Sequence, residues 1–471
     1  MSAASRRLVA GVDTSTQSVK VVVCDADSGE VVRSGRAAHP DGTEVSAAAW
    51  LSAYQEATAD PALLDGVEAV SVGGQQHGMV TLDDHDELVR DALLWNDNRS
   101  AQDALDLIAE LGGPQAWADA VGSVPVASFT VSKIRWLARH EPENAARVQR
   151  VVLPHDYLTW EIGGRSFDPV TDRGDASGTA YFDGRSSSYR DDLVELAFGR
   201  TLELPRVAAP DEVVGESPTG VKIGPGTGDN AASVLGMVVP DRTALVSLGT
   251  SGVACLRSDV QTHDPTGVVA GFADATGSFL PLVCTLNGAR NLVAMAKALN
   301  VSLAEFSELA VSAPPGSEGL VFLPYLEGER TPPLPDSKGE LRGATLRNLT
   351  AANLARATIE GVLWSLAYGV QVLREQASSV DQVMVTGGAA QSPAVRQIAA
   401  AVFGVPVLAT DPFESVAVGA ARQAAWVLTG TLPQWSAPVS GTYEPQAGEE
   451  AAAAELDGRY REAMGEVLAR A

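Results

Sequence analysis

Residues 8–24 read LVAGVDTSTQSVKVVVC, and this stretch decides the fold of the chain. Residues 8–13 form an apolar run that ends in the carboxylate of Asp13, and residues 19–24 form a second run rich in valine. The polar residues 14–18 between the two runs are typical of a turn. The stretch therefore predicts a β-hairpin whose tip is rich in hydroxyl groups.

A second stretch of the same kind lies about half a chain further on. Residues 243–256 read TALVSLGTSGVACL, which is again an apolar run, a turn of glycine and hydroxyl residues, and a second apolar run. A repeat at this distance indicates two similar domains that each contain such a hairpin. Short hydroxyl-rich hairpins are common, so the repeat supports a duplicated fold and by itself fixes no function.

The rest of the chain alternates predicted strands with predicted helices. Residues 351–376 have apolar side chains at helical spacing, and a buried strand at 383–386 precedes a turn and a helix that begins at Pro393. Two further helices are predicted at 415–428 and 446–471. This alternation is typical of the α/β class.

Length and composition narrow the class of protein. A chain of 471 residues predicts two or three domains. The segment 215–225 is rich in glycine and proline, and we expect domains over residues 1–223 and 224–471. The net charge of −25 argues against nucleic-acid and anionic-membrane partners, which need basic patches. No secretory leader pattern and no apolar stretch of bilayer length occurs, so we expect a cytoplasmic protein.

Asp229 is the strongest candidate for chemistry in the chain. It lies in the run GTGDNAA at 226–232, and glycine lets a small substrate approach the backbone closely. The turn at 249–251 can present N–H and hydroxyl groups to a phosphate. Together they suggest a base that activates a hydroxyl and a cradle for the phosphate that it attacks. The alternative, an aspartate that caps the following helix, is about equally consistent with the sequence alone.

Nine short segments along the chain resemble, in the same order, the motifs of a known protein family. The segments are 11–20, 74–78, 94–99, 153–158, 175–179, 228–232, 247–252, 322–332 and 386–389. Each is weak alone, but as an ordered set they resemble the FGGY family of carbohydrate kinases. The resemblance implies an α/β protein with two actin-like (ribonuclease H-type) ATPase domains and an active site in the cleft between them.

The resemblance also implies a role for each motif. Asp229 would be the catalytic base, and Asp13 would hold the Mg²⁺ that accompanies ATP. The sugar would contact Gln76, His77, Trp95, Asp97 and Asn230. ATP would contact Thr14, Ser15, Thr16, Lys20, Gly249, Thr250, Ser251, Gly387, Gly388 and Ala389.

Several of these positions keep a second interpretation. His77 is also consistent with a core histidine, Trp95 with a core aromatic, and 387–389 with an ordinary strand-to-helix turn. The family often has glycine where Ser15 stands and methionine where Gln76 stands. These departures bear on how closely the backbone approaches a phosphate and on whether Gln76 hydrogen-bonds the sugar.

The activity implied by the resemblance is transfer of the γ-phosphoryl group of ATP to the terminal hydroxyl of D-xylulose. One alternative is a kinase of the same family that acts on ribulose or arabinitol. Another is a non-enzymatic actin-fold protein that binds nucleotide as a switch, which the sugar-pocket segments around His77 and Asp97 disfavour. The sequence does not fix the oligomeric state, and a homodimer is the commonest one.

Overall fold

The computed structural model describes residues 6–445 and 449–470, and the chain divides into two compact units. The first unit comprises Met1–Val239, Asp259–Leu280 and Glu414–Ala437, and the second comprises Pro240–Ser258, Pro281–Phe413 and Pro438–Ala471. Each unit is therefore assembled from separate stretches of sequence. Among the described residues, no helix combines the length and the apolar character needed to cross a membrane.

The first unit is built on a mixed sheet with strand order β13-β14-β5-β1-β2-β3, and β15 also pairs with β5. The sheet strands are β1 (Leu8–Thr14), β2 (Ser18–Asp25), β3 (Val31–Ala38), β5 (Val67–Gly74), β13 (Gly215–Glu216), β14 (Lys222–Ile223) and β15 (Thr227–Gly228). Its other strands are β4 (Glu44–Val45), β6 (Val80–Leu82), β7 (Ala92–Leu93), β8 (Arg150–Val152), β9 (Val170–Thr171), β10 (Phe182–Asp183), β11 (Ser188–Tyr189), β12 (Arg206–Val207) and β18 (Ala270–Ala273). Its helices are α1 (Ala48–Ala57), α2 (Ala101–Leu111), α3 (Pro114–Val121), α4 (Thr130–His140), α5 (Pro142–Arg147), α6 (Pro154–Ile162), α7 (Arg173–Ser177), α8 (Asp191–Phe198), α9 (Asp229–Gly236) and α14 (Ser415–Thr429).

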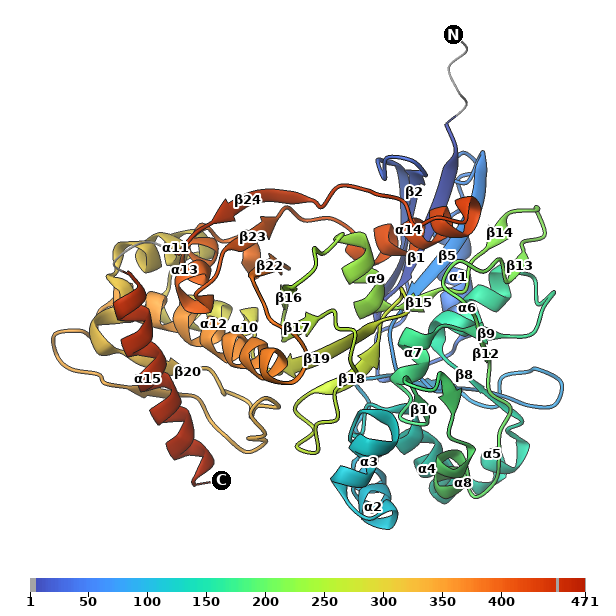
Figure 1. The fold of residues 1–471 in the computed structure, drawn as a ribbon, viewed down its shortest axis with the longest axis horizontal. Coiled ribbons are helices and arrows are strands. Elements are labelled where there is room, and N and C mark those ends of the chain that lie inside the picture. The colour runs from blue at the N-terminus through green and yellow to red at the C-terminus, as the bar shows by residue number, and fades with distance from the viewer. Residues whose placement is uncertain (1–5, 446–448, 471) are drawn as a thin grey trace, which may run out of the picture. The chain divides into compact units, whose positions relative to one another are not determined.

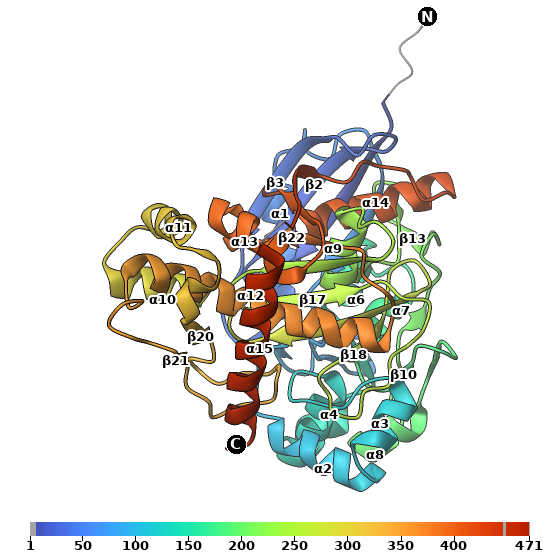
Figure 2. The same cartoon turned by 60° about the vertical axis from the view of Figure 1, so that its left-hand side comes forward.

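The second unit has a mixed sheet in which the strands follow the order β19-β17-β16-β22-β23-β24. The strands are β16 (Thr243–Leu248), β17 (Gly252–Leu256), β19 (Phe279–Thr285), β20 (Val321–Leu323), β21 (Glu340–Arg342), β22 (Gln382–Thr386), β23 (Val407–Thr410) and β24 (Val439–Tyr443). The helices are α10 (Ala289–Leu299), α11 (Leu303–Ser312), α12 (Ala351–Gln376), α13 (Pro393–Phe403) and α15 (Glu449–Leu468). Figure 2 shows α12 and α15, which pack against each other.

The two sheets share one topology, which confirms the duplication and the α/β class predicted from the sequence. In the first unit β1 pairs antiparallel with β2 and parallel with β5. In the second unit β16 pairs antiparallel with β17 and parallel with β22. Both predicted hairpins are therefore present, and each is joined to a parallel strand that comes from later in the sequence.

Small residues let α14 lie close against β1 and α9 (Figure 1). A Cβ atom at Gly11 of β1 would lie 1.9 Å from the carbonyl oxygen of Ala417 on α14. A Cβ atom at Gly419 of α14 would lie 1.8 Å from the carbonyl oxygen of Ala232 on α9. Since real Cβ atoms do not approach oxygen so closely, glycine at these positions sets the spacing that brings α9 to the sheet.

The helix predicted at 351–376 has the same first and last residues as α12. The last predicted helix corresponds to α15. Residues 446–448 and 471 of that last prediction lie outside the described residues. The domain boundary expected between residues 223 and 224 stays a prediction. The compact units divide the chain differently, because α9 belongs to the first unit and α14 returns to it from late in the sequence.

Substitution Gly419→Ala is expected to lower the free energy of unfolding by about 1–3 kcal/mol, because the new methyl group overlaps the backbone of α9. The matched control is Gly458→Ala in α15, where nothing lies within 4 Å of the added Cβ. Since alanine is the better helix former, the control is expected to be neutral or stabilising by up to about 1 kcal/mol. Urea unfolding measures both, and equal effects of the two substitutions would contradict the close crossing.

Candidate active site

Three neighbouring strands of the first unit bring the predicted site residues to one edge of the sheet. In β1, β5 and β15 the residues Asp13, Gly73 and Thr227 lie at the same level, with β5 paired in parallel with both neighbours. The segments that follow these strands therefore leave the sheet at a common edge. They contain Thr14 to Thr16, Gln76 with His77, and Asp229 with Asn230.

Asp13 ends the first strand as a buried carboxylate with a cation beside it. Lys20 lies opposite it in the β1–β2 register, with its Nζ 3.3 Å from Asp13 Oδ2 and 2.7 Å from Glu414 Oε2. Burial raises the pKa of Asp13 to about 6, although Lys20 opposes the shift. The hydroxyl of Thr14 next to it is buried and has no hydrogen-bond partner among the described residues. These oxygen groups fit a hard divalent cation such as Mg²⁺.

The tip of the first hairpin is closed by its own serine. The backbone N–H and the hydroxyl of Ser15 both donate to the carbonyl oxygen of Ser18, at 3.1 and 2.9 Å. Trp95 donates its indole N–H to Thr16 Oγ1 at 3.0 Å and is 44% exposed. Trp95 is therefore not a core residue, and its ring lies beside the hairpin tip.

Asp229 opens α9 directly after the N-cap residue Gly228, so it does not occupy the cap position itself. Asn230 Nδ2 donates to Asp229 Oδ1 at 2.9 Å and to Gln76 Oε1 at 2.8 Å. This amide links the predicted base to a predicted sugar contact. Burial, followed by the negative charges of Asp13 and Asp175, raises the pKa of Asp229 to about 7. A carboxyl group that titrates near neutral pH suits a general base.

His77 follows β5 with a positive φ of 68° and a fixed ring. Its Nδ1 donates to the carbonyl oxygen of Gly178 at 2.7 Å. The ring packs between Phe129 and Phe272, with centroid distances of 4.8 and 5.5 Å. The polar contact and the aromatic contacts together define which way the imidazole points.

Asp97, a predicted sugar contact, is hydrogen-bonded to Arg99 in the structure. Its Oδ1 accepts from the backbone N–H and the Nε of Arg99, at 3.0 and 2.9 Å, and the residue is 4% exposed. Burial alone would raise the pKa of Asp97, but the hydrogen bonds from Arg99 outweigh it and hold the pKa below its usual value. The structure thus gives Asp97 a charged partner in Arg99, and its role as a sugar contact stays a prediction.

The second unit holds the remaining predicted ATP contacts at one edge of its own sheet. Gly249, Thr250 and Ser251 connect β16 to β17, and Gly387, Gly388 and Ala389 follow β22. Ser247 and Thr386 are paired in the parallel strands, so both segments leave the sheet together. Gly387 has a φ of 95°, and a Cβ atom there would lie 2.7 Å from the carbonyl oxygen of Leu248. The two glycine-containing segments therefore lie in contact.

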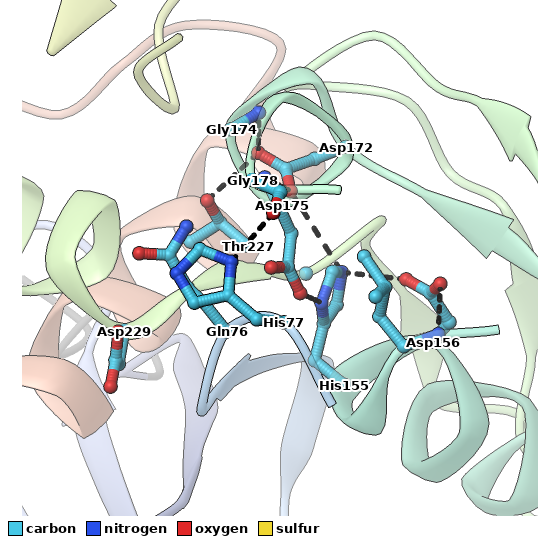
Figure 3. A network of polar contacts seen from close by, with 12 residues as sticks. Gln76, His77, His155, Asp156, Asp172, Gly174, Asp175, Gly178, Thr227 and Asp229 are labelled. Atoms are coloured by element: carbon cyan, nitrogen blue, oxygen red, sulfur yellow. Dashed lines mark hydrogen bonds and ion pairs between the residues drawn. The ribbon is translucent and has the colours of Figure 1, made fainter. Parts of the chain in front are cut away.

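A buried group of charged side chains was not assigned a role by the sequence (Figure 3). It consists of His155, Asp156, Asp172 and Asp175. The segments 153–158 and 175–179, which contain three of these residues, both resemble the family, but nothing in the sequence shows that the two segments meet. Their contacts appear only once α6 and α7 are packed together.

Comparisons with known proteins give consistent matches. Residues 8–236 match the N-terminal domain of the FGGY family of carbohydrate kinases, and residues 244–428 match its C-terminal domain. The chain is 43% identical to a xylulose kinase from Streptomyces rubiginosus, covering 100% of this chain and 98% of the relative. It is 44% identical to a xylulose kinase from Streptomyces coelicolor, covering 97% and 95%. A crystal structure of xylulose kinase from Bifidobacterium adolescentis is similar with a TM-score of 0.89 at 42% identity, covering 96% and 99%.

Substitution Asp97→Asn is expected to lower the free energy of unfolding at pH 7 by about 1.5–3 kcal/mol, because hydrogen bonds to a charged group are lost. The folded-state pKa of Asp97 is depressed, so its stabilisation is present above the unfolded-state pKa and is lost as the pH falls. The variant and the wild type should therefore converge in stability in acid. The control is the exposed Asp119→Asn, and an Asp97→Asn protein as stable as this control at pH 7 would contradict the interpretation.

Proposed function

Since the chain belongs to the FGGY family of carbohydrate kinases, we propose that it transfers the γ-phosphoryl group of ATP to the terminal hydroxyl of D-xylulose. The products are D-xylulose 5-phosphate and ADP. Similarity to xylulose kinases over nearly the whole of both chains supports this substrate. The observation that carries the chemistry is the hydrogen-bonded series Gln76, Asn230 and Asp229 beside the buried Asp13.

Asp229 is the base of the proposed reaction. A carboxylate with a pKa of about 7 accepts the proton of the attacking hydroxyl readily near neutral pH. Asn230 donates to its carboxylate and to Gln76, and both amides can offer groups to neighbouring sugar hydroxyls. His77, Trp95 and Asp97 complete the proposed sugar contacts, and Arg99 holds the carboxylate of Asp97 in place.

ATP is bound in this proposal by neutral donors from both hairpins. They are Thr14, Ser15 and Thr16 on the first, and Gly249, Thr250 and Ser251 on the second, with adenosine at Gly387, Gly388 and Ala389. Asp13 would hold Mg²⁺, which would neutralise phosphate charge. Lys20 keeps Asp13 ionised until the metal arrives. By motif order, residues 1–223 supply most of the sugar site, and residues 224–471 supply the base and the adenosine site.

A homodimer and a cytoplasmic location complete the proposal. The location rests on the lack of a secretory leader pattern and of an apolar stretch of bilayer length in the sequence. The homodimer rests on how common dimers are, and light scattering of the purified protein tests it. A coupled ADP-release assay across D-xylulose, ribulose, arabinitol and other polyols tests the substrate. If another sugar gave the highest kcat/KM, the proposed substrate would be wrong, and the proposed kinase activity would stand.

Substitution Asp229→Asn is expected to lower kcat by about 10²–10⁴-fold, because the amide cannot accept a proton. The hydrogen bond from Asn230 and the shape of the residue are largely kept, so ATP binding should persist by calorimetry. Asp119→Asn serves as the control and should retain wild-type turnover. Near-normal turnover of Asp229→Asn would remove this residue from the role of base.

The pH profile of kcat/KM provides an independent check on Asp229. Its pKa is raised to about 7, so the ionised form that accepts a proton is lost as the pH falls below that value. We expect kcat/KM for the sugar to fall about tenfold for each pH unit on the acidic side. A profile that stays flat between pH 5 and pH 8 would contradict a base with this pKa.

A further inference from the structure

His155 stands at the centre of a buried group of carboxylates (Figure 3). It is completely buried in the first turn of α6. Its Nδ1 lies 2.6 Å from Asp175 Oδ2, and its Nε2 lies 3.2 Å from Asp156 Oδ1 and 3.9 Å from Asp172 Oδ1. None of the three carboxylate residues is more than 3% exposed. One imidazole therefore faces three carboxylates in a place that water does not reach.

The surrounding carboxylates favour a charged ring, although burial opposes it. An isolated buried charge is expensive, whereas a buried ion that is paired and hydrogen-bonded is tolerated. Burial alone would lower the pKa of His155, but Asp156 and Asp175 outweigh it and raise the pKa to about 9. Burial raises the pKa of Asp156 to about 7. The other ionisable groups facing the cluster, Tyr181 and Tyr189, have raised pKa values and stay neutral.

The carboxylates that surround His155 anchor the catalytic loop. Asp172 caps α7 and accepts hydrogen bonds from the N–H groups of Gly174 and Asp175, at 2.8 and 3.0 Å. It also accepts the hydroxyl of Thr227 at 2.8 Å, two residues before Asp229. Gly226 has a φ of 79°, and a Cβ atom there would lie 2.5 Å from Cδ2 of His155. The imidazole thus touches the loop directly and also holds it through Asp172.

Helix α7 also positions two of the proposed sugar contacts, His77 and Gln76. The carbonyl oxygen of Gly178, at the end of α7, accepts the hydrogen bond from His77 Nδ1. The side chain of Gln76 interacts with Asp175 and lowers the pKa of that carboxyl group, against the larger opposite effect of burial. His77, Gln76 and the loop before Asp229 therefore all depend on α7. His155 pairs with Asp175 in α7 and with Asp172 at its N-cap.

We propose that His155 is a positioning residue that acts as a permanent imidazolium ion, binding Asp156, Asp172 and Asp175 so that Asp229 and His77 keep their reactive geometry. His155 itself touches neither sugar nor ATP. The kinetic part of this inference rests on the proposed kinase function. The claim that the ring is charged does not rest on the kinase function. The inference and the proposed function can therefore fail separately.

The charge of the ring is measured directly in the wild-type enzyme by nitrogen-15 NMR of labelled histidine. The chain has 6 histidines, and single substitutions of the other residues, His39, His77, His85, His140 and His263, assign the His155 signals by elimination. We expect both ring nitrogens of His155 to be protonated at pH 8, since its pKa is raised to about 9. A neutral ring at that pH, whether hydrogen-bonded or ligated to a metal ion, overturns the proposal and leaves the proposed function intact.

Kinetics separate positioning by charge from a merely structural role. His155→Asn keeps a donor near Asp175 and removes the positive charge, and we expect it to lower kcat about a hundredfold with an unchanged KM for ATP. The double variant His155→Asn with Asp156→Asn removes one negative charge as well and should regain most of the lost kcat. The exposed His140→Asn is the control and should behave as wild type. Equal losses in the single and double variants overturn the proposal.

Stability supplies a third readout that does not require activity. A folded-state pKa raised from 6.5 to about 9 gives stabilisation that is complete below pH 6.5 and is lost as the pH rises through 9. The Tm of the wild type should therefore fall more between pH 7 and pH 10 than that of the double variant. Parallel declines overturn the proposal, while a wild type that phosphorylates no sugar overturns only the proposed function.

Discussion

The cost of burying carboxylate charge is the constraint on which the first unit depends. Five aspartates, Asp13, Asp156, Asp172, Asp175 and Asp229, lie in or beside the same sheet edge, and burial raises the pKa of every one of them. Lys20 pairs with Asp13, and His155 pairs with Asp156, Asp172 and Asp175. Asp229 has no cation partner among the described residues. Of these five carboxylates, the one without a cation partner in the described part of the chain is the one proposed as the base.

That uneven distribution fits the role proposed for Asp229 as the base. Raising its pKa from 3.8 to about 7 corresponds to roughly 4 kcal/mol against ionisation, which the rest of the fold has to bear. Protonation by a substrate hydroxyl relieves part of that cost. A cation beside Asp229 would stabilise the carboxylate and weaken it as a base. The neutral Asn230 instead fixes its orientation through a hydrogen bond and adds no charge.

The sequence predicted what local pattern determines and left out what only packing determines. Both hairpins and the limits of α12 follow from runs of apolar side chains, and the structure confirms them. Asp229 was identified from its glycine-rich surroundings, but the hydrogen bond from its neighbour Asn230 to Gln76 joins residues 154 positions apart. The cluster around His155 needs the junction of α6 and α7, which no periodicity encodes. The role first given to Asp97 rested on its motif alone, and its contact with Arg99 became visible only in the folded chain.

The two hairpins show how a duplicated element can take on two kinds of chemistry. The first places Asp13 and Lys20 opposite each other just before its tip, so it brings a carboxylate that attracts a cation. The second has Ser247 and Val253 at the corresponding pair, and Gly249, Thr250 and Ser251 form its tip, so this end of the hairpin is uncharged. A carboxylate repels phosphate, whereas N–H and hydroxyl donors attract it. The first hairpin therefore adds a carboxylate suited to a metal ion to its hydroxyl donors, whereas the second offers donors alone. This difference requires no change in backbone topology.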